Sequence, residues 1–236
     1  MIHLMKLEMQ KNRIRTYIYA SIIITITMIG FIYLFAYAPQ IEPNDPDMLI
    51  FAGYDNLIRL YGVVNMAIFC VFSCVMYTRF IIEAYNGNQL MLLFSYPINQ
   101  QKILLSKIFI VVLFTSFSII ICNTIVFSIF SITESFIPIM TDAFSITFML
   151  LALKTTIFMM ISAASLSVIA TGIGFFTKSV PSTIIAGVLL SSIFCNIVFH
   201  SLTNDRILFI FMIVALLAST VITFLLMNKV NKLEVL

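Results

Sequence analysis

Six long stretches without a charged residue are the feature that most constrains the fold of this chain of 236 residues. They span residues 16–41, 60–78, 108–133, 155–177, 179–204 and 207–228. A helix crosses the hydrocarbon core of a bilayer, about 30 Å thick, with about 20 mostly apolar residues. All six stretches are close to or above that length, so the sequence predicts six transmembrane helices.

The composition excludes several classes of protein. Hydrophobic residues make up 61% of the chain and charged residues only 10%, against about 25% charged residues in an ordinary soluble domain. A soluble fold of this size could not hide that much apolar surface, which excludes a soluble enzyme. The net charge is only +3 and basic residues form no long runs, which excludes a disordered chain and a nucleic-acid-binding protein.

The apolar stretches are continuous and do not alternate with polar residues. Strands of a membrane barrel would alternate, because one of their faces lines a polar interior. The predicted fold class is therefore an all-α, polytopic membrane protein. The six stretches leave no room for an additional soluble domain, so residues 1–236 are expected to form a single transmembrane domain.

The distribution of lysine and arginine predicts the orientation. If the N-terminus is cytoplasmic, ten of these residues fall on the inner side and three, Arg59, Lys154 and Arg206, on the outer side. Inner loops carry an excess of basic residues, so both termini are predicted to be cytoplasmic. The first apolar stretch is longer than the 7–15 residues of a signal-peptide core, so we expect it to remain as a helix.

Polar residues within the predicted spans leave two interpretations open. Asn65, Asn123 and Asn196 need hydrogen-bond partners in the membrane. They either bond between helices or line a cargo pathway. Lys154 lies between the apolar stretch 143–153 and a predicted span. It lies either at the outer interface or inside the bundle, where it would contact cargo at a cost of at least about 2.5–3.5 kcal/mol.

Small residues recur every four positions in the fourth predicted span. Ala163, Ser167 and Thr171 form one such series, and Ala170 and Gly174 another. Small residues at this interval allow helices to approach closely. The stripe therefore indicates either packing within the chain or contact with a second copy of the protein.

No catalytic or cofactor-binding motif is present in the sequence. The two histidines, His3 and His200, lie near opposite ends of the chain, and no span holds a pair of carboxylates. The four cysteines lie within apolar runs, as small buried hydrophobic residues do. The Gly-x4-Gly-Lys-Ser/Thr pattern of a phosphate-binding loop is missing. We therefore predict that the chain is not an enzyme and holds no metal or cofactor of its own.

The predicted inner loop between the second and third spans is the most informative segment. Asparagine, glutamine and proline residues in window 84–101 would be unsatisfied in lipid, so this window must lie outside the hydrocarbon. Residues 89–94 can form a short amphipathic helix that ends before Pro97. Such a helix needs a surface to cover it, either lipid headgroups or another protein. Gly87 and Pro97 could also be ordinary loop punctuation.

This loop resembles the loop after the second span in the permease subunits of type-2 ATP-binding-cassette (ABC) exporters. The residues that carry the resemblance are Glu83, Gly87, Leu90 to Leu93, Pro97, Ile103 to Leu105 and Lys107. Lys102 is expected to take part in the same coupling segment. The six spans, the basic segment before the first span and the chain length also match, and the similarity is greatest to the small permeases of bacitracin- and lantibiotic-immunity systems. The chain departs from the pattern at residues 99–101, Asn-Gln-Gln, where family members often carry a basic residue.

The resemblance implies a function for each part of the chain. Segment 83–107 would be a cytoplasmic coupling loop whose helix docks on a separate ATP-binding subunit, present in two copies. Segment 1–15 would be an amphipathic helix along the inner face of a bacterial cytoplasmic membrane. A second permease subunit, identical or related, would complete the transporter, with ATP and Mg²⁺ bound by the partner. The cargo would be amphipathic, such as a peptide antibiotic, a lantibiotic or a lipid-like drug, and its export would give resistance.

A second hypothesis remains open from the sequence. The substrate-capturing membrane subunit of a vitamin-type importer is also a small protein with six spans. That hypothesis requires tight binding of a small molecule by the isolated chain. The sequence identifies neither the cargo nor the partner of the permease.

Overall fold

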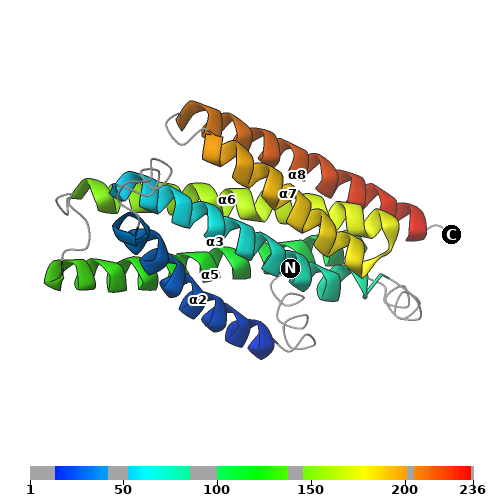
Figure 1. Ribbon diagram of the computed structural model, residues 1–236. Coiled ribbons are helices and arrows are strands. Elements are labelled where there is room, and N and C mark those ends of the chain that lie inside the picture. Colours follow the sequence, from blue (N-terminus) through cyan, green and yellow to red (C-terminus); the bar gives the residue numbers. More distant parts are fainter. Residues whose placement is uncertain (1–13, 42–52, 86–99, 138–145, 201–204, 235–236) are drawn as a thin grey trace.

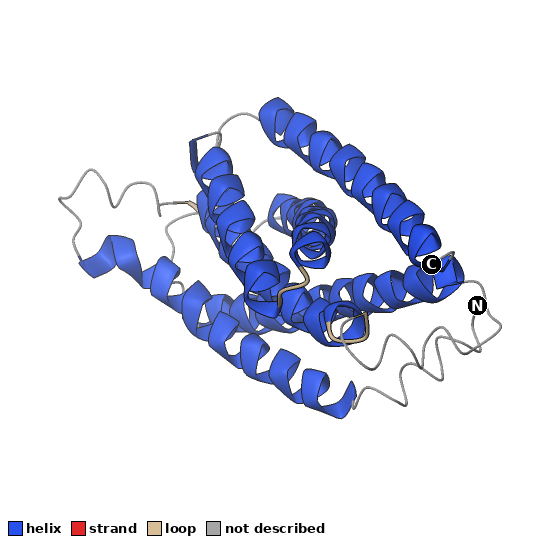
Figure 2. Cartoon of the chain, turned by 90° about the vertical axis from the view of Figure 1, so that its right-hand side faces the viewer, coloured by secondary structure: helices blue, strands red, loops and turns tan. Residues whose placement is uncertain are grey.

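The computed structural model describes residues 14–41, 53–85, 100–137, 146–200 and 205–234. Within these ranges, six helices are long and apolar enough to cross a membrane (Figure 1). They are α2 (Ile14–Ile41), α3 (Tyr54–Tyr77) with its π-helical continuation η2 (Thr78–Ile82), α5 (Gln100–Phe136), α6 (Ile146–Thr177), α7 (Val180–His200) and α8 (Asp205–Glu234). The six predicted spans are confirmed as helices. No strand is present in the described parts of the chain (Figure 2).

Consecutive helices run in opposite directions, which gives the bundle two distinct ends (Figure 1). One end, on the right in Figure 1, holds the start of α5 with Lys107 and the last turn of α6. We call it the Lys107 end. The opposite end holds the start of α3 and the first turns of α6 with Lys154, and we call it the Lys154 end. The positive-inside pattern predicts that the Lys107 end is cytoplasmic.

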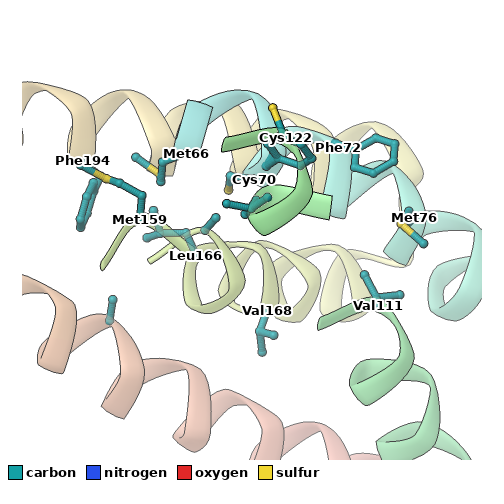
Figure 3. Packing of buried hydrophobic residues seen from close by; sticks show 14 of the residues in the cluster. Met66, Cys70, Phe72, Met76, Val111, Cys122, Met159, Leu166, Val168 and Phe194 are labelled. Atoms are coloured by element: carbon teal, nitrogen blue, oxygen red, sulfur yellow. The ribbon is translucent and has the colours of Figure 1, made fainter. Parts of the chain in front are cut away.

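Helices α3 and α6 form the centre of the bundle. Two thirds of the apolar part of α3 is buried, against about a tenth of α2 and a sixth of α8. Helix α6 contacts α3, α5, α7 and α8. In the close view, Met66 of α3, Met159 of α6 and Phe194 of α7 lie together in the core (Figure 3). Large apolar side chains on the outer helices point outward, such as Phe224 of α8, as lipid contact requires.

Close helix contacts explain the glycines and the small residues of α6. A Cβ added to Gly62 of α3 would lie 2.7 Å from Thr155 of α6, and one added to Gly187 of α7 would lie 2.5 Å from Cys74 of α3. Ala163, Ser167, Thr171 and Ala170 are all buried within the chain. The small-residue stripe therefore packs within the chain, and the described surfaces do not leave it exposed for a second copy.

A short turn joins α6 to α7. Lys178 adopts the left-handed conformation with φ 51°, and the Ser179 N–H donates to the Gly174 carbonyl at 3.2 Å. This pattern satisfies carbonyls at the end of α6 and reverses the chain. Pro181 lies in the first turn of α7, where the absence of an N–H costs nothing. The two helices are thereby held side by side at the Lys107 end.

The helices extend beyond the charge-free spans. Helix α5 starts at Gln100, eight residues before the predicted span, and is 37 residues long. Helix α6 is one continuous helix of 32 residues in which Lys154 occupies the ninth position. The apolar residues that precede Lys154 are therefore a helical extension from residue 146 onward. Lys154 is exposed on this helix, and its place at a membrane boundary stays a prediction.

Candidate functional site

The Lys107 end brings together the two flanks of the predicted coupling loop. Of the predicted loop 83–107, residues 83–85 and 100–107 are described, and they form its two flanks. Four of the predicted coupling residues, Gly87, Leu90, Leu93 and Pro97, lie outside the described residues, as does most of the predicted N-terminal amphipathic segment. The structure therefore informs on how the loop is anchored.

Tyr85 is the centre of this anchor. Its side chain is buried and packs edge-on against Phe175 in the last turn of α6, with ring centroids 5.5 Å apart. The Lys107 ammonium of α5 lies 5.5 Å from the centroid of the Tyr85 ring, within the range of a cation–π interaction. Lys107 itself is only 1% exposed. Both flanks of the loop are thus attached to each other and to α6.

Helix α8 joins the same cluster. The Lys229 ammonium lies 4.3 Å from the centroid of Phe176 and 6.0 Å from that of Phe175. We call Tyr85, Lys107, Phe175, Phe176 and Lys229 the Tyr85 junction. Tyr85, which follows η2, contacts α5 and α6 directly, and α6 in turn contacts α8 through Lys229.

Glu83 and Lys102 lie at the same end but are held more loosely. Glu83 accepts a hydrogen bond from Arg79 Nη1 at 2.7 Å, and both side chains are substantially exposed. An exposed pair of this kind contributes less than about 1 kcal/mol. Lys102 is exposed, whereas Lys107 is buried, although the sequence suggested one role for both. A π-helical turn, which often marks a functional region, immediately precedes Glu83, with the Glu83 N–H bonded to the Thr78 carbonyl.

A second group of polar residues lies in the interior of the bundle. Asn123 Oδ1 of α5 accepts hydrogen bonds from the Tyr61 hydroxyl at 3.1 Å and from Asn65 Nδ2, both of α3. Asn123 Nδ2 donates to Thr156 Oγ1 of α6 at 2.9 Å. Asn65 and Asn123 are 1% and 3% exposed. We call these four residues the Asn123 cluster. Its geometry is that of interhelical bonding among three helices.

The other two predicted pathway residues lie elsewhere. Asn196 is exposed on α7 and donates to the Ser192 carbonyl of its own helix at 2.9 Å. Lys154 is exposed on α6 near the Lys154 end. The structure therefore brings Asn65 and Asn123 together and separates Asn196 and Lys154 from them. Tyr61 and Thr156, which complete the cluster, were not predicted, because an aromatic residue and a threonine within apolar runs give no functional signal.

Within the described residues, six long apolar helices that run in alternating directions define a polytopic helical membrane protein. The family model of the ABC-2 family transporter protein matches residues 4–193, and the chain therefore belongs to this family of type-2 ABC permeases. It is 27% identical over 192 residues to "Uncharacterized protein YcbO" of Bacillus subtilis (strain 168), an alignment that covers 80% of this chain and 81% of that protein. No significant match was found among solved structures.

Family membership confirms the predicted resemblance to the type-2 ABC permeases. Members of this family are the membrane component of a transporter and are not themselves catalytic, since a partner subunit hydrolyses ATP. With six apolar helices, the chain is a multi-pass membrane protein, which in bacteria lies in the cytoplasmic membrane.

Proposed function

We propose that this chain is the permease subunit of an ABC exporter. Both termini would be cytoplasmic, and loop 83–107 would be bound by the ATP-binding subunit. The observation that carries this proposal is the Tyr85 junction. The junction ties the two flanks of the loop to each other through Tyr85 and Lys107, and to α6 and α8 through Phe175 and Lys229. A loop anchored in this way can pass motion to the helices.

The transporter would contain two permease subunits, identical or related, and two ATP-binding subunits. ATP and Mg²⁺ would be bound by the ATP-binding subunits, and the permease would hold no cofactor. ATP would shift the equilibrium between the open and closed states of the transporter, and the size of this shift is limited by how much more tightly ATP binds the closed state. The permease contributes the coupling contacts and the path for the cargo.

The cargo would be amphipathic, such as a peptide antibiotic, a lantibiotic or a lipid-like drug, and its export would protect the cell. Apolar outer faces of α2, α7 and α8 support this proposal. The polar groups of the Asn123 cluster are engaged with one another instead of lining a wide polar channel within the described bundle. The family match favours this function over that of a substrate-capturing subunit of a vitamin-type importer.

Replacing Leu90 and Leu93 together by aspartate is expected to release the ATP-binding subunit. Each leucine buried in a protein groove contributes about 1.5–3 kcal/mol, so the loss of both predicts at least about a tenfold decrease in the co-purified subunit. The measurement is affinity purification of the tagged chain, co-expressed in turn with ABC ATP-binding subunits of its own genome.

A matched control places the same two charges at the same end of the bundle. Asn228 and Asn231 are exposed on α8, and their joint replacement by aspartate is expected to leave the co-purified amount within about twofold. The docking proposal fails if the Leu90 and Leu93 variant retains its ATP-binding subunit as the control does.

Tyr85→Ala is expected to separate binding of the ATP-binding subunit from the motion that it drives. The variant removes the ring that contacts Phe175 and Lys107 but leaves the docking leucines in place. A fluorophore attached at Lys178→Cys, in the α6–α7 turn, should change its emission on ATP addition in the wild-type complex and not in Tyr85→Ala. Tyr85→Phe keeps the ring and should behave as wild type. An unchanged response in Tyr85→Ala would refute the coupling role of the ring.

A further inference from the structure

The exit of α3 contains one residue more than a regular helix would hold. In the π-helical turn η2, the Glu83 N–H donates to the Thr78 carbonyl at 2.9 Å. A bond to the fifth preceding residue encloses one residue more than the bond to the fourth that defines an α-helix. The Tyr85 N–H donates to the Ile81 carbonyl, four residues back, at 3.0 Å. Helical bonding of the α type therefore resumes directly after the turn.

The surplus residue determines which way Tyr85 faces. In a regular α-helix, which advances about 100° per residue, Tyr85 would lie about 80° away from the face of Tyr77. With one residue absorbed in η2, the two rings lie only about 20° apart around the helix axis. Their contacts agree with this. The Tyr77 hydroxyl donates to the Ile108 carbonyl of α5 at 3.4 Å, and the Tyr85 ring lies beside Lys107 of α5.

The part of α3 before the turn is held firmly. It packs closely against α6 at Gly62 and against α7 at Cys74, and Tyr61 and Asn65 bond it to Asn123 of α5. A force applied to the loop could rotate α3 as a whole only by breaking these contacts. Within the described part of this span, η2 holds the surplus residue, so it is the place where the chain can change its rotation.

Conversion of η2 to α-helix would exchange backbone hydrogen bonds instead of removing them. The Glu83 N–H would move from the Thr78 carbonyl to the Arg79 carbonyl. With α3 fixed, the chain after the turn would rotate by about 100° and advance by about 1.5 Å. Ala84, a buried residue, would then take the position of Tyr85, and the ring would leave the Tyr85 junction.

We propose that η2 is a register switch between α3 and the coupling loop. Its π-helical form holds Tyr85 in the Tyr85 junction, and its α-helical form withdraws the ring and rotates the start of the loop. Movement of the loop by the ATP-binding subunit would drive the conversion. The inference rests on the proposed function for this driving force, whereas the two forms of the turn are a property of the chain itself.

Deletion of Arg79 removes the surplus residue. The Arg79 side chain is 62% exposed, whereas the other residues of η2 are buried. Its loss lets the buried side chains before and after it keep their faces in a regular α-helix. The variant should therefore stay monodisperse and melt within a few degrees of the wild-type chain. Deletion of Ala67, in the regular part of α3, turns residues 68–77 by about 100° and should lower the melting temperature strongly.

Hydrogen–deuterium exchange of the full chain in detergent tests the switch without the ATP-binding subunit. A helix with no surplus residue has no second register, so deletion of Arg79 should slow exchange at amides 80–84 by about tenfold. Arg79→Ala removes the side chain but keeps the surplus residue, and exchange there should stay close to that of wild type. Equal exchange rates in the deletion variant and in wild type would overturn the proposal.

Spin labels measure whether ATP drives the switch. One label is attached at Glu83→Cys, after the turn, and the other at Asn228→Cys, which is exposed on α8. A rotation of about 100° at a side-chain radius of about 5–6 Å displaces the first label by about 8 Å. In the complex with the ATP-binding subunit, ATP should therefore change the distance between the labels in the chain with Arg79 or with Arg79→Ala, but not after deletion of Arg79.

A second label pair accounts for movement of whole helices. Val75 is exposed on α3 before the turn, so labels at Val75→Cys and Asn228→Cys report any displacement of α3 relative to α8. The switch predicts a change at Glu83→Cys beyond the change at Val75→Cys. Equal changes at the two positions would refute it. The four native cysteines are buried or partly buried, and labelling of the unsubstituted chain gives the background signal.

The outcomes distinguish failure of the switch from failure of the proposed function. If no ATP-binding subunit co-purifies with the wild-type chain, the proposed function fails, and the exchange measurement alone decides on the switch. If the subunit co-purifies and the change at Glu83→Cys persists after deletion of Arg79, the switch is refuted and the proposed function stands. A deletion of Arg79 as destabilising as that of Ala67 would show that η2 holds no surplus residue, which also refutes the switch.

Discussion

Gly174→Val is expected to prevent the chain from forming a stable bundle. A Cβ at this position of α6 would lie 1.7 Å from Thr183 Oγ1 and 3.2 Å from the Thr183 Cα of α7. The second of these atoms is backbone, so relief requires α7 to move away from α6. Overpacking of this kind costs about 1–3 kcal/mol and occasionally more, and valine adds two methyl groups to the same contact. We expect a large decrease in monodisperse protein and in its melting temperature in detergent.

Gly30→Val is the matched control. Gly30 lies within α2, is exposed, and has no atom within 4 Å of an added Cβ. The same substitution there should leave the melting temperature nearly unchanged. In the milder variant Gly174→Ala, a second substitution, Thr183→Gly, removes the clashing hydroxyl and Cβ and should recover part of the loss. Equal melting temperatures for Gly174→Val and Gly30→Val would show that α6 and α7 are not in close contact.

The positions of the spans could be predicted because the signal is local. An apolar run of about 20 residues between charges has the length of a membrane-spanning helix. Only a helix or a closed barrel satisfies the backbone hydrogen bonds of such a run in lipid. The ends of the helices are harder to predict from the sequence, because polar residues are tolerated once the helix leaves the hydrocarbon. Helix α5 therefore begins at Gln100 and carries Lys102 and Lys107 within it, although the charge-free stretch begins only at residue 108.

The candidate site could be predicted only in part, for a related reason. The sequence predicted a coupling loop that includes Glu83 and Lys107 from a pattern along the chain, and this prediction is not tested by the structure. The sequence could not show that Tyr85 contacts Phe175, since these residues are 90 positions apart and neither belongs to a periodic polar pattern. Direct contacts between distant segments depend on how the helices pack.

The three asparagines show the same limit. Their helices are apolar on every face, so the sequence does not reveal which face meets a neighbouring helix. Asn65 and Asn123 face each other across α3 and α5, whereas Asn196 faces outward from α7. Asn123 and Asn196 are the same residue type within equally apolar spans, and this makes them a natural pair for an experiment.

Asn123→Leu is expected to destabilise the bundle by about 2–4 kcal/mol. Asn123 takes part in three side-chain hydrogen bonds, with Tyr61, Asn65 and Thr156. Hydrogen bonds between membrane helices average about 0.6 kcal/mol and reach about 1.7 kcal/mol. Partners left buried and unsatisfied add further cost. Reversible unfolding in mixed micelles measures the change in free energy of unfolding.

Asn196→Leu should have the opposite or no effect. Its amide is exposed and bonds only to the Ser192 carbonyl of its own helix, so leucine replaces a polar group at the lipid-facing surface with an apolar one. Asn65→Leu should fall between the two, because Asn65 donates one bond to the cluster and Asn123 retains Tyr61 and Thr156. If Asn123→Leu and Asn196→Leu are equally stable, the Asn123 cluster does not hold α3, α5 and α6 together. A cluster that contributes nothing to stability would then be better explained as part of the cargo pathway, the alternative that the sequence left open.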